Sequence, residues 1–85
     1  MWFVYIVECK NGAFYTGLTN DVDRRVKMHN AGRGARYTRI FGPVRLKYFE
    51  EFEERIDAMR REWAIKKLER KHKRHLIKSG LGKKR

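Results

Sequence analysis

The sequence predicts an α+β fold in which helices cover the faces of a small antiparallel sheet, in the order strand, strand, helix, strand, helix, helix. Three observations predict this order. The first residues alternate between two apolar faces, Asn11-Gly12 follows them as a hairpin signal, and the later apolar residues have helical spacing except in one strand-like stretch. Eighty-five residues, of which 41% are hydrophobic, make one small domain without room for a second core.

Both faces of the predicted first strand, residues 2–9, are apolar. This pattern is typical of a strand that is covered on both sides, so we expect it at the centre of a three-stranded antiparallel sheet. The stretch AFYTGL, after the hairpin signal, returns as the second strand.

The length of the hairpin loop decides how two tyrosines are arranged. A two-residue loop would point Tyr5 and Tyr15 to opposite faces of the sheet. A three-residue loop, with Gly12 left-handed beside a bulge, places Tyr5 opposite Gly17, and Tyr15 then lies diagonally beside Tyr5 on the same face. Gly17 has no side chain and would leave space over Tyr5. The residues by themselves leave both loops open.

The first helix is expected from about Asp21 to Ala31, with Asn20 as its N-cap and Gly32 at its end. A basic loop that contains glycine, GRGARYTRIFGP, follows this helix, and VRLKYFEEF then gives the third strand.

Two further helices are expected over about residues 53–68 and 70–78. The acidic start of the first of them suits the positive end of a helix dipole, and we prefer this interpretation to a carboxylate metal cluster. We therefore predict a single domain over residues 1–79 and a basic, disordered tail over residues 80–85.

The charge of the chain indicates an anionic partner. The formal net charge is +12, and residues 66–85 hold ten Lys and Arg against one acid, Glu69. Such a distribution fits nucleic acid. A basic surface that only keeps the protein soluble is the alternative, and an anionic membrane is disfavoured because no long amphipathic helix accompanies the charge.

Cysteine content and the opening residues favour a cytoplasmic protein. The single Cys9 excludes an internal disulfide. The opening WFVYIV is too short for a secretory core or a membrane span and is followed by Glu8.

Within the first helix, Val22, Arg25, Val26 and His29 fall on one stripe. An arginine and a histidine are unusual neighbours for two valines on a stripe that should face the core. The stripe can therefore face a site rather than a sealed interior, although a snorkelling arginine is the ordinary alternative.

Together, VYIVEC, FYTG, TNDVDRRVKMHN and a glutamate in the second predicted helix resemble the GIY-YIG nuclease domain. The resemblance is to small stand-alone bacterial members of unassigned function, and it covers about residues 2–79. Phe3-Val4-Tyr5 stands where the family has Gly-Ile-Tyr, and Thr16 replaces an isoleucine. The resemblance implies a GIY-YIG-like β-β-α-β-α-α fold with both tyrosines in one site, and on this basis we predict the three-residue loop.

The resemblance also implies a phosphodiesterase that uses one divalent metal ion, Mg²⁺ or Mn²⁺. Glu62 would hold the metal, unless it only pairs with Lys66 one turn further on. Arg25 would meet the phosphate, and Tyr5 would activate water with help from a neutral His29. Tyr15 would position the phosphate or the water.

Basic residues on either side of this site would bind nucleic acid, without reading its sequence. They are Arg33, Arg36, Tyr37, Thr38, Arg39, Lys66, Lys67, Arg70, Lys71, Lys73 and Arg74. We expect a monomer that cleaves DNA, with a protein partner as a source of specificity. The alternative is a nucleic-acid-binding module that keeps the fold without the chemistry, and RNA is a further possible substrate.

Overall fold

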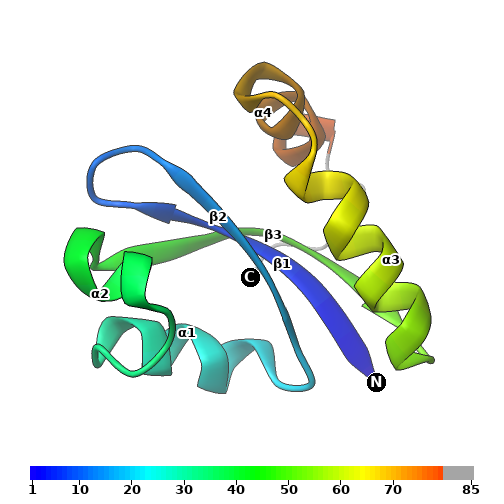
Figure 1. Ribbon diagram of the computed structural model, residues 1–85, viewed down its shortest axis with the longest axis horizontal. Coiled ribbons are helices and arrows are strands. Elements are labelled where there is room, and N and C mark those ends of the chain that lie inside the picture. The colour runs from blue at the N-terminus through cyan, green and yellow to red at the C-terminus, as the bar shows by residue number, and fades with distance from the viewer. Residues whose placement is uncertain (80–85) are drawn as a thin grey trace.

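The computed structural model describes residues 1–79 and contains three strands and four helices in this part of the chain (Figure 1). In chain order they are β1 (Trp2–Cys9), β2 (Phe14–Thr19), α1 (Val22–Asn30), α2 (Arg36–Phe41), β3 (Val44–Phe52), α3 (Arg55–Lys66) and α4 (Arg70–Ser79). The predicted tail over residues 80–85 lies outside the described residues.

The sheet has the order β2-β1-β3, and both pairings of β1 are antiparallel, so the predicted central position of the first strand is confirmed. Successive residues of β1 enter two separate apolar cores. Val4 and Ile6 pack with residues of α3 and α4, whereas Tyr5 and Val7 pack on the other face with Val22 of α1. Figure 1 shows the same division, with α1 and α2 on one side of the sheet and α3 and α4 on the other.

The hairpin has the predicted three-residue register. Tyr5 pairs with Gly17 and Val7 with Tyr15, so both tyrosines share the face that α1 covers. Gly12 has a φ of 87°, the left-handed conformation that this loop requires and that glycine adopts without strain. Its backbone N–H donates to the Cys9 carbonyl at 2.8 Å and closes the turn.

The structure corrects two expectations about the segments around α1. The side chain of Asp21, rather than that of Asn20, caps α1 by accepting a hydrogen bond from the Arg24 N–H at 3.1 Å. The basic segment before β3 is not wholly a loop, because Arg36–Phe41 forms the short helix α2.

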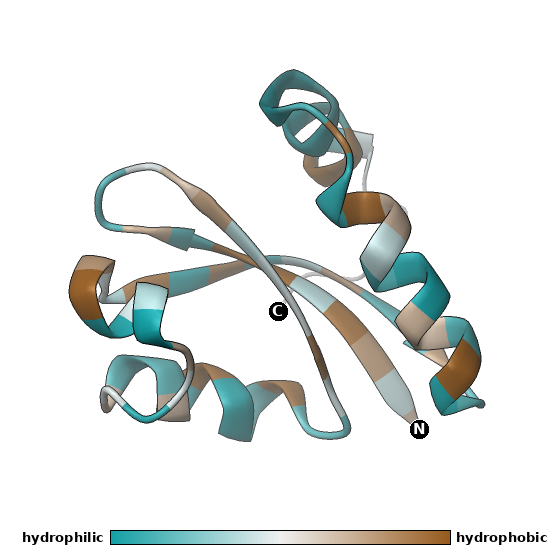
Figure 2. Cartoon of the chain, in the orientation of Figure 1, coloured by the Kyte–Doolittle hydropathy of each residue, from teal (hydrophilic) through white to brown (hydrophobic). Residues whose placement is uncertain are grey.

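The outer helix α4 is strongly polar, as its teal colour in Figure 2 shows, and contributes only Ile77 to the fully buried residues. None of the helices among residues 1–79 is long and apolar enough to cross a membrane.

Candidate active site

A chain of three buried side chains links β1, α1 and α2. The Tyr5 hydroxyl lies 2.7 Å from Nε2 of His29, and Nδ1 of His29 lies 2.6 Å from the Thr38 hydroxyl. All three residues are at most 1% exposed. Helix α1 therefore places His29 against the face of the sheet that carries Tyr5 and Tyr15.

The hydrogen bonds of Thr38 favour one tautomer of His29. When the Thr38 hydroxyl donates its only proton to the Ala35 carbonyl at 3.0 Å, its oxygen can accept from Nδ1–H of His29. Neutral His29 then presents an unprotonated Nε2 to Tyr5, whose hydroxyl is the donor. The arrangement is ready to accept a proton from Tyr5.

Two glycines leave room for this chain. A Cβ on Gly17 would collide with the Tyr5 hydroxyl, and a Cβ on Gly34 would collide with Nδ1 of His29. The space that Gly17 was expected to leave over Tyr5 is therefore confirmed. Gly34 was not singled out in the sequence, where it reads as one glycine of a basic loop.

Tyr15 and Arg25 complete the surroundings of Tyr5. The Tyr15 ring makes an edge contact with His29, with centroids 5.3 Å apart. Arg25 lies beside Tyr5, and its Nε atom is buried and lacks a hydrogen-bond partner within residues 1–79. A buried guanidinium N–H without an acceptor is costly, and a phosphate oxygen is a suitable acceptor for it.

Burial shifts both titratable members of the chain toward their neutral forms. It raises the pKa of Tyr5, and this effect outweighs the opposing influence of the nearby Arg25 guanidinium. It lowers the pKa of His29, and the positive charge of Arg25 lowers it further. At neutral pH the pair consists of a phenol and a neutral imidazole.

Glu62 approaches from α3, which packs on the opposite face of the sheet. Its side chain is 18% exposed and forms an ion pair with Lys66 at 3.0 Å. The Glu62 charge contributes to the raised pKa of Tyr5, so the two groups are within electrostatic range. The structure thus links four predicted site residues by contact or close approach and leaves Glu62 near them, engaged by a lysine.

The predicted basic surface on the α2 side is exposed, with one exception. Arg33, Arg36 and Arg39 line an open hollow of about 350 Å³, and the nearby Tyr37 is 40% exposed. Thr38 is instead buried and engaged with His29, so the structure places it as a support for the site rather than on the binding surface.

The second basic surface lies on α3 and α4, across the sheet from α2. Arg70 packs its guanidinium over the Phe14 ring at 4.5 Å, and Lys67 lies over the Trp63 ring at 4.4 Å. The side chains of Lys66, Lys71 and Arg74 are exposed, and Lys73 is half-buried.

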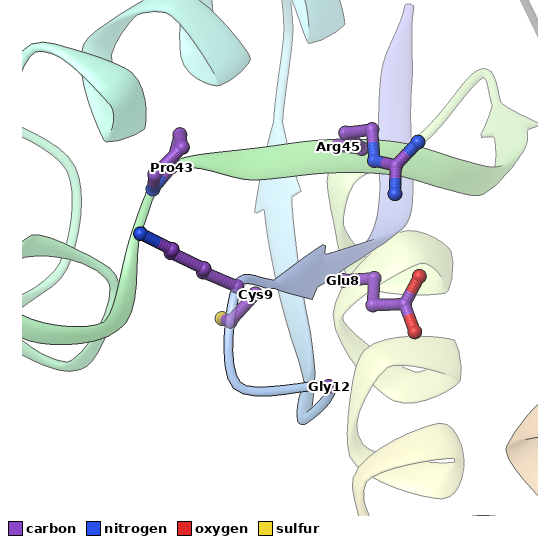
Figure 3. A pocket seen from close by; sticks show the side chains of 6 residues that line it. Glu8, Cys9, Gly12, Pro43 and Arg45 are labelled. Atoms are coloured by element: carbon purple, nitrogen blue, oxygen red, sulfur yellow. The ribbon is translucent and has the colours of Figure 1, made fainter.

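A hollow of about 380 Å³ at the hairpin end of β1 stands apart from this site (Figure 3). Its lining includes Glu8, Cys9, Pro43 and Arg45, and none of the predicted catalytic residues. Glu8 is 3.8 Å from Lys47, and nothing here suggests a reacting group.

Asn30 at the end of α1 is a positioning residue that the sequence analysis missed. Its side-chain oxygen accepts from the Val44 N–H at 2.7 Å, and its Nδ2 donates to the Val44 carbonyl at 3.2 Å. These bonds fasten α1, and so His29, to the start of β3. The sequence carries no signal for them, because Val44 is distant along the chain.

Comparison with known proteins agrees with this geometry. The family model of the GIY-YIG catalytic domain matches residues 1–75, and the chain belongs to this family. Its relatives come from bacteria and archaea and are known as UPF0213 proteins, a name that assigns no function.

The similarity to individual relatives covers nearly whole chains. UPF0213 protein CPE1444 of Clostridium perfringens is 53% identical over 79 residues, which are 93% of this chain and 85% of the relative. UPF0213 protein VNG_2274C of Halobacterium salinarum is 53% identical over 91% of this chain and all of its own length. The solution NMR structure of UPF0213 protein BH0048 from Bacillus halodurans superposes with a TM-score of 0.61 at 49% identity, covering 98% of this chain and 88% of that one.

Proposed function

We propose that the protein is a divalent-metal-dependent nuclease that hydrolyses phosphodiester bonds of DNA with little sequence specificity. The observation that carries this proposal is the buried chain from Tyr5 through His29 to Thr38, beside an arginine with an unused donor. Hydrolysis needs a group that takes a proton from water and a donor for the charge that develops on the phosphate. Membership in the GIY-YIG catalytic family supports this reading.

In this mechanism Tyr5 relays a proton. The attacking water gives its proton to the Tyr5 oxygen while the Tyr5 proton passes to Nε2 of His29, so no free phenolate is needed. The Nδ1–H of His29 stays hydrogen-bonded to Thr38 throughout. Arg25 donates to the phosphate oxygen as its negative charge grows, and Tyr15 orients the water or the phosphate.

Glu62 is the residue that would hold the metal. Among residues 1–79 no cluster of three or more His, Cys, Asp and Glu side chains suits a metal, so Glu62 would be the single protein ligand. One carboxylate with waters and substrate phosphate is a normal shell for Mg²⁺ or Mn²⁺. The ion would stabilise the developing charge and the leaving oxygen.

The test is a cleavage assay on supercoiled plasmid, single-stranded and branched DNA, and RNA, with Mg²⁺, Mn²⁺ or EDTA. We expect metal-dependent cleavage that Glu62→Ala and Arg25→Ala abolish, each purified in parallel to expose contaminating nuclease. Lys27→Ala is the matched control, since Lys27 is exposed on α1. Arg24, the other exposed candidate, lines a surface hollow with Arg25 and is a poorer control. Cleavage that survives in both variants would overturn the proposal.

A nucleic-acid-binding module without chemistry is the second candidate. The ion pair between Glu62 and Lys66 at 3.0 Å favours this candidate, because the lysine already neutralises the carboxylate without a metal ion. In that case Glu62→Ala would leave salt-sensitive binding unchanged, and no cleavage would occur with any metal.

A further inference from the structure

The outer flank of α3 carries exposed apolar residues that pack in neither of the two cores. Trp63 is 68% exposed, Ile56 51% and Met59 39%, and with Arg60 they line a shallow hollow of about 270 Å³. We call these four residues the α3 shelf. An exposed tryptophan in such a surface indicates a binding partner.

The α3 shelf lies on the flank of the helix that also carries Glu62. Ala58 and Ile65 point into the core. Around one flank of the helix, at increasing angles from this buried line, lie Glu62, then Met59 and then Trp63. Arg61 lies on the opposite flank, where it binds Glu50 of β3. A molecule bound at Glu62 can therefore extend outward onto Trp63.

The charge around the shelf selects the kind of partner. The ammonium of Lys67 sits over the Trp63 ring at 4.4 Å. Lys67 lies one turn after Trp63 and Met59 one turn before it, so the cation and the hollow flank the ring along the helix axis. Lys66 lies between Glu62 and the shelf around the helix. An aromatic ring among cations fits a planar base attached to a phosphate chain better than it fits an apolar protein surface.

We propose that the α3 shelf is a stacking site for an unpaired nucleobase, with Trp63 as the platform and Lys66 and Lys67 meeting the adjoining phosphates. This inference rests on the proposed nucleic-acid substrate and adds a subsite to the proposed site. The strand bound at Glu62 would place a neighbouring unpaired base on the indole of Trp63. Base–aromatic stacking tolerates any base, which agrees with the little sequence specificity proposed above.

The test is fluorescence anisotropy of the whole chain in EDTA, so that cleavage plays no part. The probes are a labelled oligothymidine, the matching oligouridine, an abasic strand of equal length and a duplex. We expect Trp63→Ala to weaken oligothymidine binding about tenfold while leaving the abasic strand unchanged, and Trp63→Phe to retain most of the difference. The oligouridine arm separates DNA from RNA as the source of the base. Ile40→Ala is the control, because Ile40 is 61% exposed on α2.

Three results would overturn the stacking site. They are a wild type that binds based and abasic strands equally, a Trp63→Ala variant that binds oligothymidine as the wild type does, and an equal loss on both strands. The outcome is independent of the cleavage assay. Glu62→Ala keeps the base preference if the shelf works as proposed, and a base preference without cleavage would reject only the nuclease.

Discussion

His29 is the residue of α1 that connects Tyr5 of β1 to Thr38 of α2 in the candidate site. Its Nε2 faces the Tyr5 hydroxyl, its Nδ1 faces the Thr38 hydroxyl, and it is 1% exposed. The bond from the Thr38 hydroxyl to the Ala35 carbonyl favours the tautomer with an unprotonated Nε2, which a proton acceptor needs. In the proposed nuclease, Thr38→Val should therefore reduce the rate of cleavage strongly, although the Thr38 side chain does not contact the substrate.

The lowered pKa of His29 gives a prediction about pH. Burial and Arg25 hold this pKa below 6.5, so between the lowered value and 6.5 the unfolded chain binds more protons at this position than the native protein. The free energy of unfolding should fall as the pH drops through that window. Cleavage by the proposed nuclease should fall at lower pH, as the pH drops through the lowered native pKa of His29, because protonated Nε2 cannot accept from Tyr5.

Urea unfolding of the wild type and of His29→Gln, from about pH 7.5 down to about pH 5, measures this effect. The variant should show a flatter dependence on pH. His75→Gln, an exposed position on α4, should behave as the wild type does. Equal slopes for the wild type and His29→Gln would contradict the prediction.

Gly17 gives a prediction about packing. Gly17→Ala pushes a methyl group into the Tyr5 hydroxyl, and overpacking of this kind costs about 1–3 kcal/mol of stability. Thermal unfolding should show the loss, and cleavage should drop further than stability because Tyr5 is displaced. Adding Tyr5→Phe, which removes the hydroxyl, should restore part of the stability. A Gly17→Ala variant as stable as the wild type would mean that Tyr5 can move aside freely.

Among the elements, the strands and long helices could be predicted because their signals are local. The apolar residues on both faces of residues 2–9 mark β1 as central, and glycine at position 12 permits the observed turn. The choice between the two loops needed the family resemblance. Helix α2 was not predicted because its six residues lie between Gly34 and Gly42, with Gly32 close before them, a composition typical of a loop. Its formation depends on tertiary contacts such as Thr38 with His29, which no local pattern contains.

The same limit applies to the candidate site. Tyr5, Arg25 and His29 could be named from spacing and resemblance, and the structure places them together. The support for His29 could not be found that way. Thr38 was expected on the basic binding surface, and Asn30 was not singled out.

The attachment of α3 to the sheet gives a prediction about an element. The Arg61 guanidinium donates to both carboxylate oxygens of Glu50, at 2.8 and 2.9 Å, and the Tyr48 hydroxyl donates to the same carboxylate. Arg61→Met should lower the free energy of unfolding by about 1 kcal/mol, as expected for a partly exposed pair.

Because α3 also carries Glu62, Arg61→Met should in addition weaken Mn²⁺ binding, measured by the relaxation of water protons. Arg60→Met, at an exposed position on the same helix, should change neither quantity. Unchanged Mn²⁺ binding in Arg61→Met would show that the hydrogen bonds between Arg61 and Glu50 are needed for stability alone.

At the scale of the whole molecule, the two basic surfaces lie on opposite sides of the sheet, with α2 on one side and α4 on the other (Figure 1). If about six phosphates are neutralised, log K should fall with log salt with a slope of about −5. Replacing Lys71 and Arg74 with Gln should reduce that slope by about 2, since each contact contributes about 0.9. Arg45→Gln, outside both surfaces, is the control. An unchanged slope in the double variant would remove α4 from the binding surface.

The hairpin loop has a consequence that reaches beyond its own three residues. In the observed register, odd-numbered residues of β1 and β2 share one face and even-numbered residues share the other. Deleting Asn11 would invert this parity for β2 and carry Tyr15 and Gly17 away from Tyr5, although every residue of the candidate site would still be present in the chain. Assembly of the candidate site thus depends on the number of residues in the loop as well as on the identity of the site residues. A search by motif letters alone would accept a chain in which the two tyrosines lie on opposite faces of the sheet.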